Sequence, residues 1–272
     1  MTTDRRPVIG FLTDFGLDGA AATCRGVILS ICPDAQIVDI AHTVPKFGIA
    51  DGAFILSAAL PYFPVGVHVA VVDPGVGTSR RPVALRTDRG DVLVGPDNGL
   101  LIPAADALGG IGDARELSNR DWWLPAASST FHGRDIFSPV AGHLAAGSAT
   151  FELLGPQIVP ATLERLPVAR ARVEDGALHT EVAYVDTFGN ARLAGTGDEL
   201  HAAIGTEGGA VEVTVGGGRH RAHFVRTFGE VDAGNALVYV DSSGHPAVGL
   251  SQGDFASAAG ARRGDRVVIR RG

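Results

Sequence analysis

The sequence is poor in the features that mark secreted and membrane-spanning proteins. It has only 2 cysteines, Cys24 and Cys32, in 272 residues. They are expected to lie on one helix, where the geometry for a disulfide is poor. No apolar run approaches the roughly 20 residues that span a bilayer, and the N-terminal segment lacks the apolar core and cleavage site of a secretion signal. We therefore expect a reduced, cytoplasmic protein that does not enter membranes.

Several binding and catalytic signatures are also missing. The formal net charge is -7 and lysines and arginines form no block, so nucleic acid is not an expected partner. There is no G-x-x-x-x-G-K-[ST] phosphate loop and no G-x-S-x-G nucleophile elbow. Neither His-x-His nor His-x-x-x-His occurs. The 45% hydrophobic content is nevertheless enough for a sizeable core.

The N-terminal part alternates apolar segments of two kinds. Three β-branched segments are predicted as strands: 7–12, 36–40 and 67–72. Between them, residues 24–31 and 49–60 carry apolar side chains at helical spacing, and Asp18 is the predicted cap of the first helix. Strands that alternate with helices favour right-handed crossovers and a largely parallel sheet.

The pattern changes after residue 81. Residues 82–99 are predicted as two strands joined by a tight Arg-Gly turn, and helices are expected at 100–108 and 134–146. The segment 155–176, with three prolines and several arginines, is a candidate linker. Beyond it the helix signal fades, and short strands separated by glycine turns are typical of a small barrel or sandwich.

We expect two domains, with a boundary near residue 168. Residues 1–167 are predicted to form an N-terminal α/β domain with a mostly parallel sheet. Residues 168–272 are predicted to form a smaller, all-β, barrel-like domain.

The most informative stretch is the segment 67–81, which ends in DPGVGTSRR. Asp73 follows an apolar strand at its carboxyl end, where open α/β sheets bind ligands. The glycines of the next turn would let the backbone approach that ligand, and Arg80 can reach back toward Asp73. One acid and one base at a strand end form a plausible half-site.

Three further polar clusters lie at predicted strand ends or in loops: Asp14 in TDFG, Asp97-Asn98 in GPDNG and His132 in TFHGRD. Each also has a structural interpretation. Asp14 fits a helix-entry cap equally well, Asp97-Asn98-Gly99 is a good turn sequence, and Arg134-Asp135 is better explained as an ion pair or cap than as catalytic. Two other histidines are interpreted as ordinary polar side chains: His42 and His143.

Taken together, acids and histidines at strand ends fit either a two-metal hydrolase or metal-free chemistry. A two-metal hydrolase needs bridging carboxylates and several imidazoles. An arginine next to the proposed carboxylate would oppose metal binding, so metal-free chemistry is favoured, with no metal and no cofactor.

The second half contains two more candidate sites. In DTFGN, Asp186, Phe188 and Asn190 combine an anion, a flat ring and an amide, which could hold an ammonium group, a nucleobase face and a nucleobase edge. A β-turn explains this stretch equally well. Ser242 and Ser243 supply donors for a carboxylate, although a plain turn is the simpler interpretation.

Six motifs, in order over nearly the whole chain, resemble the S-adenosylmethionine (SAM) hydroxide adenosyltransferases, the SAM hydrolase group related to fluorinase and chlorinase. They are TDFG (13–16), IVDIAH (37–42), YFPVGVHVAVVDPGVGTSRR (62–81), VGPDNGLL (94–101), TFHGRDIFSPVA (130–141) and DTFGN (186–190). The resemblance implies the two-domain architecture and a homotrimer, with each active site between the N-terminal domain of one subunit and the C-terminal domain of its neighbour.

The resemblance also implies a reaction and a set of residues. Water or hydroxide would displace L-methionine from the ribose 5′-carbon of SAM and give adenosine, without a metal or cofactor. The residues that match the family's functional positions are Asp73, Arg80 and His132 for the water, Asp14 for the ribose, Asp186 for the methionine ammonium, Phe188 and Asn190 for the nucleobase, and Ser242 and Ser243 for the methionine carboxylate.

One position separates the alternatives. Halogenating relatives carry a tyrosine where this chain has Asp73, so the resemblance favours water over halide as the nucleophile. A chlorinase-like halide transferase and a sensor that binds SAM or adenosine without turnover are the alternative functions.

Overall fold

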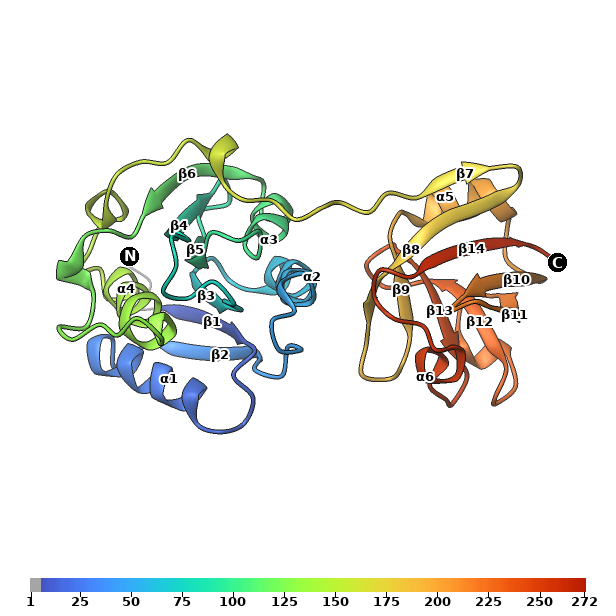
Figure 1. The fold of residues 1–272 in the computed structure, drawn as a ribbon, viewed down its shortest axis with the longest axis horizontal. Helices are drawn as coiled ribbons and strands as arrows, with labels where there is room; N and C mark the ends of the chain where they lie inside the picture. Colours follow the sequence, from blue (N-terminus) through green and yellow to red (C-terminus); the bar gives the residue numbers. More distant parts are fainter. Residues whose placement is uncertain (1–5) are drawn as a thin grey trace. The chain divides into compact units, whose positions relative to one another are not determined.

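The computed structural model describes residues 6–272, which form two compact units that divide between Leu166 and Pro167 (Figure 1). Unit 1 is built on a six-stranded sheet of order β2-β1-β3-β5-β4-β6. Strands β2, β1, β3 and β5 run parallel, whereas β4 is antiparallel to β5 and β6. The six strands are β1 (Val8–Thr13), β2 (Gln36–Ala41), β3 (Val67–Val71), β4 (Pro82–Thr87), β5 (Val92–Pro96) and β6 (Ile111–Glu116). The predicted α/β class with a mostly parallel sheet is confirmed.

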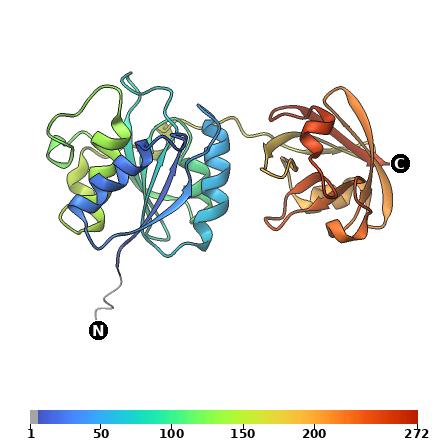
Figure 2. The same ribbon diagram turned by 90° about the horizontal axis from the view of Figure 1, so that it is seen from below.

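Helices cover both faces of this sheet (Figures 1 and 2). They are α1 (Ala20–Ile31) and α4 (Ser138–Ala145) on one face, and α2 (Ile49–Ala59) and α3 (Ile102–Ala107) on the other. Successive strand residues point to opposite faces, and β1 shows this directly. Phe11 packs with the α1 and α4 layer, and Leu12 packs with the α2 and α3 layer. The carboxyl ends of the strands therefore stand between two packed helical layers.

Two predictions for this unit were wrong. Helix α1 starts after Gly19, which has φ 95° and occupies the cap position, so Asp18 does not cap it. The segment 155–176 is not a simple linker, because Ile158 and Leu163 are buried in the core of unit 1. The composition of this stretch is typical of a loop, but its apolar side chains pack into the core and fix part of it to unit 1.

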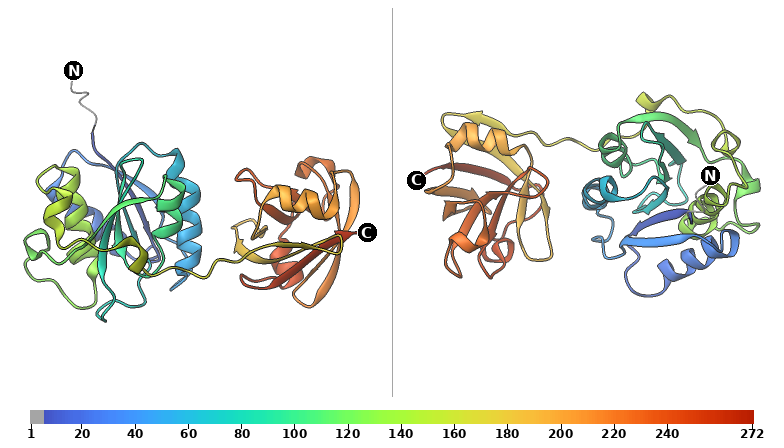
Figure 3. Two further views of the ribbon diagram at one scale, coloured as in Figure 1. Left: turned by 90° about the horizontal axis from the view of Figure 1, so that it is seen from above. Right: turned by 180° about the vertical axis from the view of Figure 1, so that it is seen from behind.

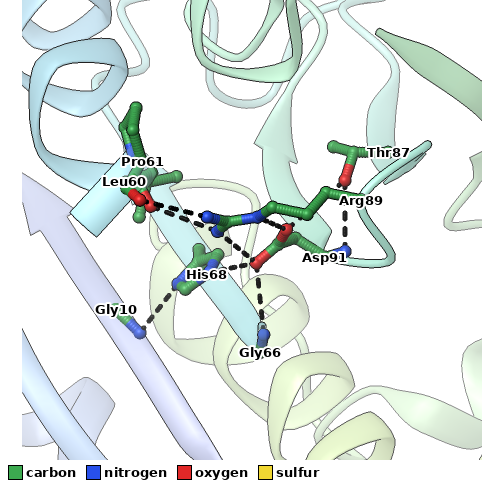
Figure 4. A network of polar contacts seen from close by, with 8 residues as sticks. All are labelled: Gly10, Leu60, Pro61, Gly66, His68, Thr87, Arg89 and Asp91. Carbon is green, nitrogen blue, oxygen red and sulfur yellow. Dashed lines mark hydrogen bonds and ion pairs between the residues drawn. The ribbon is translucent and has the colours of Figure 1, made fainter. Parts of the chain in front are cut away.

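A buried polar network ties the amino ends of β3 and β5 together (Figure 4). The Asp91 carboxylate accepts hydrogen bonds from His68 Nε2 at 3.0 Å, Arg89 Nε at 2.7 Å and the Gly66 amide at 3.2 Å. His68 Nδ1 accepts the Gly10 amide at 3.2 Å, so the His68 proton lies on Nε2. A Cβ at position 10 would stand 2.6 Å from that ring nitrogen, which explains the glycine in the middle of β1.

Unit 2 is a closed β-barrel (Figure 3). The order β14-β10-β11-β12-β13-β9-β8 is closed by pairing of β14 with β8, and β7 adds to β8. The strands are β7 (Arg172–Glu174), β8 (Ala177–Val185), β9 (Ala191–Leu193), β10 (Gly209–Val215), β11 (Gly218–Phe224), β12 (Ala236–Val240), β13 (Pro246–Leu250) and β14 (Arg266–Arg271). Alternating residues such as Val211, Val213 and Val215 fill its core. The predicted barrel-like class is confirmed.

Unit 2 also contains helices α5 (Gly197–Ile204) and α6 (Phe255–Ala259), so the expectation of strands alone was incomplete. Thr196 caps α5 in a capping box, in which its hydroxyl accepts the Glu199 amide and Glu199 accepts the Thr196 amide. The chain also has short 3-10 helices at Leu60–Tyr62, Arg120–Trp122, Phe151–Leu154, Pro160–Thr162 and Phe228–Glu230, and a π-helix at Gly133–Phe137.

Candidate active site

Polar residues follow the carboxyl ends of neighbouring strands in unit 1. Asp14 comes directly after β1, and Asp73 comes two residues after β3. The Asp14 amide donates to the Val71 carbonyl at 3.4 Å, and the Asn98 side-chain amide donates to the Val72 carbonyl at 2.9 Å. The ends of β1, β3 and β5 are therefore joined next to Asp73, in the crevice position that open α/β sheets use for ligands.

Arg80 connects the other two members of the predicted triad. Its Nε donates to Asp73 Oδ1 at 3.1 Å, and its Nη2 forms the second hydrogen bond, to Asp73 Oδ2. The same Nη2 lies 3.1 Å from His132 Nδ1. The Arg80 and Asp73 side chains are only 7% and 5% exposed, and the guanidinium lies over the Phe137 ring, 5.4 Å from its centroid. The structure thus brings Asp73, Arg80 and His132 together, with Arg80 in contact with both of the others.

The contact with Arg80 determines the protonation of His132. A guanidinium can only donate, so His132 Nδ1 is an acceptor and the ring proton lies on Nε2. Burial lowers the pKa of His132, and the positive charge of Arg80 lowers it further. His132 is therefore a neutral imidazole with one N–H available at neutral pH.

His132 lies in a loop that is held by hydrogen bonds to Asp135. It immediately precedes the Gly133–Phe137 π-helix, a form often found at functional sites. The buried Asp135 carboxylate accepts hydrogen bonds from the Ser128 amide and hydroxyl, both at 2.8 Å, and from Arg134. The interpretation of Arg134-Asp135 as a local ion pair is confirmed, whereas the alternative of a helix cap is wrong, because His132 is at the cap position and no side chain caps the helix.

Gly77 allows the turn that carries Asp73 and Arg80 to pack on the loop before His132. It has φ 76°, and a Cβ there would stand 2.5 Å from the Ser129 carbonyl oxygen. The turn that carries Asp73 and Arg80 therefore packs on the loop that leads to His132. At Gly77, the contact with this loop by itself requires a residue without a side chain.

A cavity of about 190 Å³ opens beside the triad. Its lining residues are Asp14, Phe15, Phe47, Val71, Asp73, Val76, Thr130, Phe131, His132 and Gly133. Apolar side chains thus surround two carboxylates and one imidazole. Asp14 is not a helix cap, because the cap position of α1 is Gly19; its Oδ2 instead accepts the Phe47 amide at 2.9 Å.

The Asp97-Asn98 pair has structural partners. Asp97 is 7% exposed and accepts Arg81 Nη2 at 2.6 Å and the Glu164 amide at 2.9 Å. Asn98 Oδ1 accepts the Leu100 amide at 3.2 Å. The turn interpretation of these residues is supported, and their effect on the site is to hold the end of β3.

The DTFGN stretch of unit 2 forms a tight turn. Asp186 Oδ1 accepts the Phe188 and Asn190 amides at 2.9 Å, and Oδ2 accepts the Asn190 side-chain amide, also at 2.9 Å. Phe188 is 77% exposed. The turn therefore presents a bare aromatic ring, whereas Asp186 and Asn190 are bonded to each other.

The second predicted site in unit 2 is also a turn. Asp241 Oδ1 accepts the Ser243 amide at 2.7 Å and the His245 amide at 3.0 Å. Ser242 and Ser243 are exposed beside it. Their hydroxyls and the nearby backbone could hold a small anion, and a purely structural turn uses the same geometry.

Sequence reasoning missed two residues near the cavity. His42 bonds Thr13, the residue before Asp14, at 2.9 Å. Phe47 lines the cavity, is 69% exposed and has φ 64°, which is unusual for a residue with a side chain. The DIAH and PKFG stretches contain no periodic signal that would have distinguished these side chains from loop residues.

Between residues 6 and 272, no group of three or more His, Cys, Asp and Glu side chains is arranged to hold a metal ion. None of the helices in this range has the length and apolar character needed to cross a bilayer.

Comparison with known proteins points to one family. Residues 9–155 match the model of the SAM hydroxide adenosyltransferase N-terminal domain, and residues 180–268 match that of its C-terminal domain. The chain is 46% identical to the (R)-S-adenosyl-L-methionine hydrolase of Salinispora tropica, with 98% of each chain covered. It is 32% identical to the fluorinase of Nocardia brasiliensis, covering 70% of this chain and 71% of the relative.

A solved structure has a similar fold. The chain superposes on an uncharacterized conserved protein from Thermotoga maritima with a TM-score of 0.89 and 37% identity, covering 97% of this chain and 100% of the other. The chain belongs to the SAM hydroxide adenosyltransferase family.

Proposed function

We propose that this protein is an (R)-S-adenosyl-L-methionine hydrolase that converts SAM and water to adenosine and L-methionine. The observation that carries the proposal is the contact of Asp73, Arg80 and His132 beside a cavity that Asp14 also lines. Relatives named as hydrolases match nearly the whole chain at 46% and 41% identity, which supports this reaction over halide transfer.

In the proposed reaction, Asp73 and His132 hold one water in line with the bond between sulfur and the ribose 5′-carbon. His132 Nε2–H donates to the water oxygen, because Nδ1 is bonded to Arg80. Asp73 accepts a proton from the water through a lone pair that Arg80 does not use. The carbon–oxygen bond forms as the carbon–sulfur bond breaks, its electron pair goes to sulfur, and the proton passes from Asp73 to solvent.

Arg80 has two roles in this mechanism. It is permanently charged, so it fixes the orientation of the Asp73 carboxylate and stabilises the hydroxide character that develops on the water. It also keeps His132 in one tautomer. Positioning of the water can supply about 7–11 kcal/mol at most, and proton acceptance adds about 10²–10⁴-fold.

The charge change of the reaction suits an enclosed site. SAM carries a sulfonium, and the products are a neutral thioether and a neutral nucleoside plus a proton. A halide anion would face the Asp73 carboxylate and be repelled, whereas a neutral water is attracted to it as a proton donor. The alternative of a halide transferase is therefore less well supported.

The remaining site residues extend the proposal to substrate binding. Asp14 would accept hydrogen bonds from the ribose hydroxyls, and Phe188 with Asn190 would contact the adenine. Asp186 would hold the methionine ammonium, with Ser242 and Ser243 at its carboxylate. Asp14 and the triad lie in unit 1, whereas the other substrate-binding residues lie in unit 2. Because the family resemblance implies a homotrimer, we propose that unit 2 of a neighbouring subunit completes each site.

The decisive experiment is product identification with matched variants. Purified protein incubated with SAM in ¹⁸O-enriched water should give adenosine with the label in its 5′-hydroxyl. Asp73→Asn should lower kcat by about 10²–10⁴-fold while SAM binding, measured by calorimetry, changes little. Asp34→Asn, an exposed carboxylate elsewhere in unit 1, serves as the control and should retain full activity.

Other outcomes would contradict the proposal. A halogenated nucleoside in chloride-containing buffer would indicate halide transfer, and unchanged SAM with tight binding would indicate a sensor. The subunit arrangement is tested by mixing Asp73→Asn and Phe188→Ala chains during expression. Mixed trimers should recover activity that neither variant shows alone, since some sites then combine an intact unit 1 with an intact unit 2.

A further inference from the structure

His42 lies at the end of β2 and contacts the turn that carries Asp14. Its Nδ1 is 2.9 Å from Thr13 Oγ1, and its carbonyl accepts the Gly16 amide at 2.7 Å. The ring edge also packs on Phe11, with 4.9 Å between centroids. A single residue, directly after the neighbouring strand, therefore holds both ends of the Thr13–Gly16 turn.

Asp14 lies inside this turn, and its direction depends on the turn's shape. Thr13 is fully buried, and its Oγ1 accepts the Phe15 amide at 3.2 Å as well as facing His42. The Asp14 carboxylate is held on its other side by the Phe47 amide at 2.9 Å. A shift of the Thr13 hydroxyl would consequently move the carboxylate relative to the cavity.

Two further side chains orient the His42 ring. Its Nε2 lies 3.0 Å from Asp39 Oδ1, and the other Asp39 oxygen is paired with Arg25 of α1. A carboxylate only accepts, so Nε2 carries a proton and Nδ1 is directed at the Thr13 hydroxyl. The ring is 12% exposed. Arg25, Asp39, His42 and Thr13 thus form one chain of polar contacts from α1 through β2 to β1.

We propose that His42 is a positioning residue for SAM hydrolysis, which acts through Thr13 and Gly16 to aim the Asp14 carboxylate at the substrate ribose. The inference rests on the proposed function and assigns a role to a residue outside the triad. His42 does not line the cavity and is not bonded to the triad. Its effect therefore reaches the substrate only through this turn.

Steady-state kinetics test this role with a matched control. His42→Ala should raise KM for SAM by on the order of 10-fold, the value of one net hydrogen bond. It should change kcat by less than about 3-fold, because an interaction made equally in ground and transition states affects KM alone. His42→Asn should restore most of the KM, since its side-chain amide can take the place of Nδ1.

His143 provides the control. Its Nδ1 lies 2.9 Å from Ser148 Oγ, and its ring packs edge-on against Trp122 at 5.1 Å. It repeats the histidine–hydroxyl–aromatic arrangement at a place that does not line the cavity. His143→Ala should leave KM and kcat unchanged.

Coupling to Asp14 makes the test specific. If His42 acts through Asp14, His42→Ala should have no further effect on KM in an Asp14→Ala background, because the two changes remove the same interaction. Additive effects would overturn the inference. A large fall in kcat at unchanged KM, as expected for Asp73→Asn, would also overturn it.

Amide hydrogen exchange gives an outcome that does not depend on activity. In His42→Ala, the Phe15, Gly16 and Phe47 amides should exchange faster, whereas amides in the middle of β1 should keep their protection. Uniformly faster exchange across the sheet would mean a general loss of stability and would overturn the inference. If the wild-type protein fails to hydrolyse SAM, the proposed function is refuted, while this measurement still shows whether His42 positions the turn.

Discussion

Replacement of Asp91 by alanine should destabilise unit 1 without affecting the reaction. The Asp91 carboxylate is fully buried and is the common acceptor of His68, Arg89 and the Gly66 amide (Figure 4). Removal of the carboxylate would leave three buried or partly buried donors without an acceptor. Breaking a buried ion pair from one side costs about 3–5 kcal/mol, so we expect a loss of this size in the free energy of unfolding.

Tryptophan fluorescence during urea unfolding is a suitable assay. The chain has 2 tryptophans, Trp122 and Trp123, and both lie in unit 1, so the signal reports this unit alone. Asp88→Ala is the matched control, because Asp88 lies in the same β4–β5 connection but is exposed. It should shift the free energy by no more than about 0.5 kcal/mol.

The pH dependence of this difference gives a second check. Burial raises the pKa of Asp91, but hydrogen bonds from His68 and Arg89 outweigh it and hold the pKa well below its usual value. A depressed carboxyl pKa contributes stability that is present above about pH 4 and is lost as pH falls toward the folded-state pKa. The stability gap between wild type and Asp91→Ala should therefore shrink below about pH 4.

The reasoning would be refuted if Asp91→Ala changed the free energy of unfolding by less than about 1 kcal/mol, the value of an ordinary hydrogen bond. It would also fail if the variant lowered kcat for SAM in its folded population. The network lies at the amino ends of β3 and β5, whereas the triad lies past the carboxyl end of β3, so stability and activity should separate.

Other predictions follow from the titrating groups. In an NMR titration, His132 should have a midpoint below 6.5, because burial and then Arg80 lower its pKa. Arg80→Met removes the repelling charge and should raise the midpoint, so an equal or lower value would contradict the proposed contact. Burial raises the pKa of Cys24 to about 11 and also raises that of Cys32. Both thiols should resist iodoacetamide at pH 8 until the protein is unfolded with urea, as followed by mass spectrometry.

Much of the fold could be predicted because its signals are local. The strands β1 and β3 are continuous apolar runs, and Cys24 and Ile28 on α1 have helical spacing. Helix α5 was not predicted, although Thr196 and Glu199 have the spacing of a capping box. The helix has only 8 residues, and the surrounding glycines favour turns. The shortest strands, such as β9 with 3 residues, are defined by their partners rather than by their own pattern.

The candidate site was predictable only in part. Arg80 follows Asp73 by seven positions, and a turn between them makes their contact foreseeable. His132 lies 52 positions beyond Arg80, and no spacing rule connects the two. Its place in the triad followed only from family resemblance. His42 could not be found because its role depends on the neighbouring strand's turn.

The sheet topology explains why these distant residues meet. Strands β2, β1, β3 and β5 are parallel neighbours in this order, so the residues that follow them emerge along one edge. These are His42, Asp14, Asp73 and Asn98. His42 bonds Thr13 at the end of β1, Asp14 donates to Val71 at the end of β3, and Asn98 donates to Val72 beside Asp73.

The antiparallel strand β4 then starts at this same edge, because it runs opposite to β5. Arg80 and Arg81, which precede it, are therefore delivered to the acids that end β3 and β5, where they bond Asp73 and Asp97. A carboxylate at a parallel strand end would otherwise be an isolated charge in a largely apolar crevice. The reversed direction of β4 thus gives both Asp73 and Asp97 a guanidinium partner. The second N–H of Arg80 Nη2 then donates to His132.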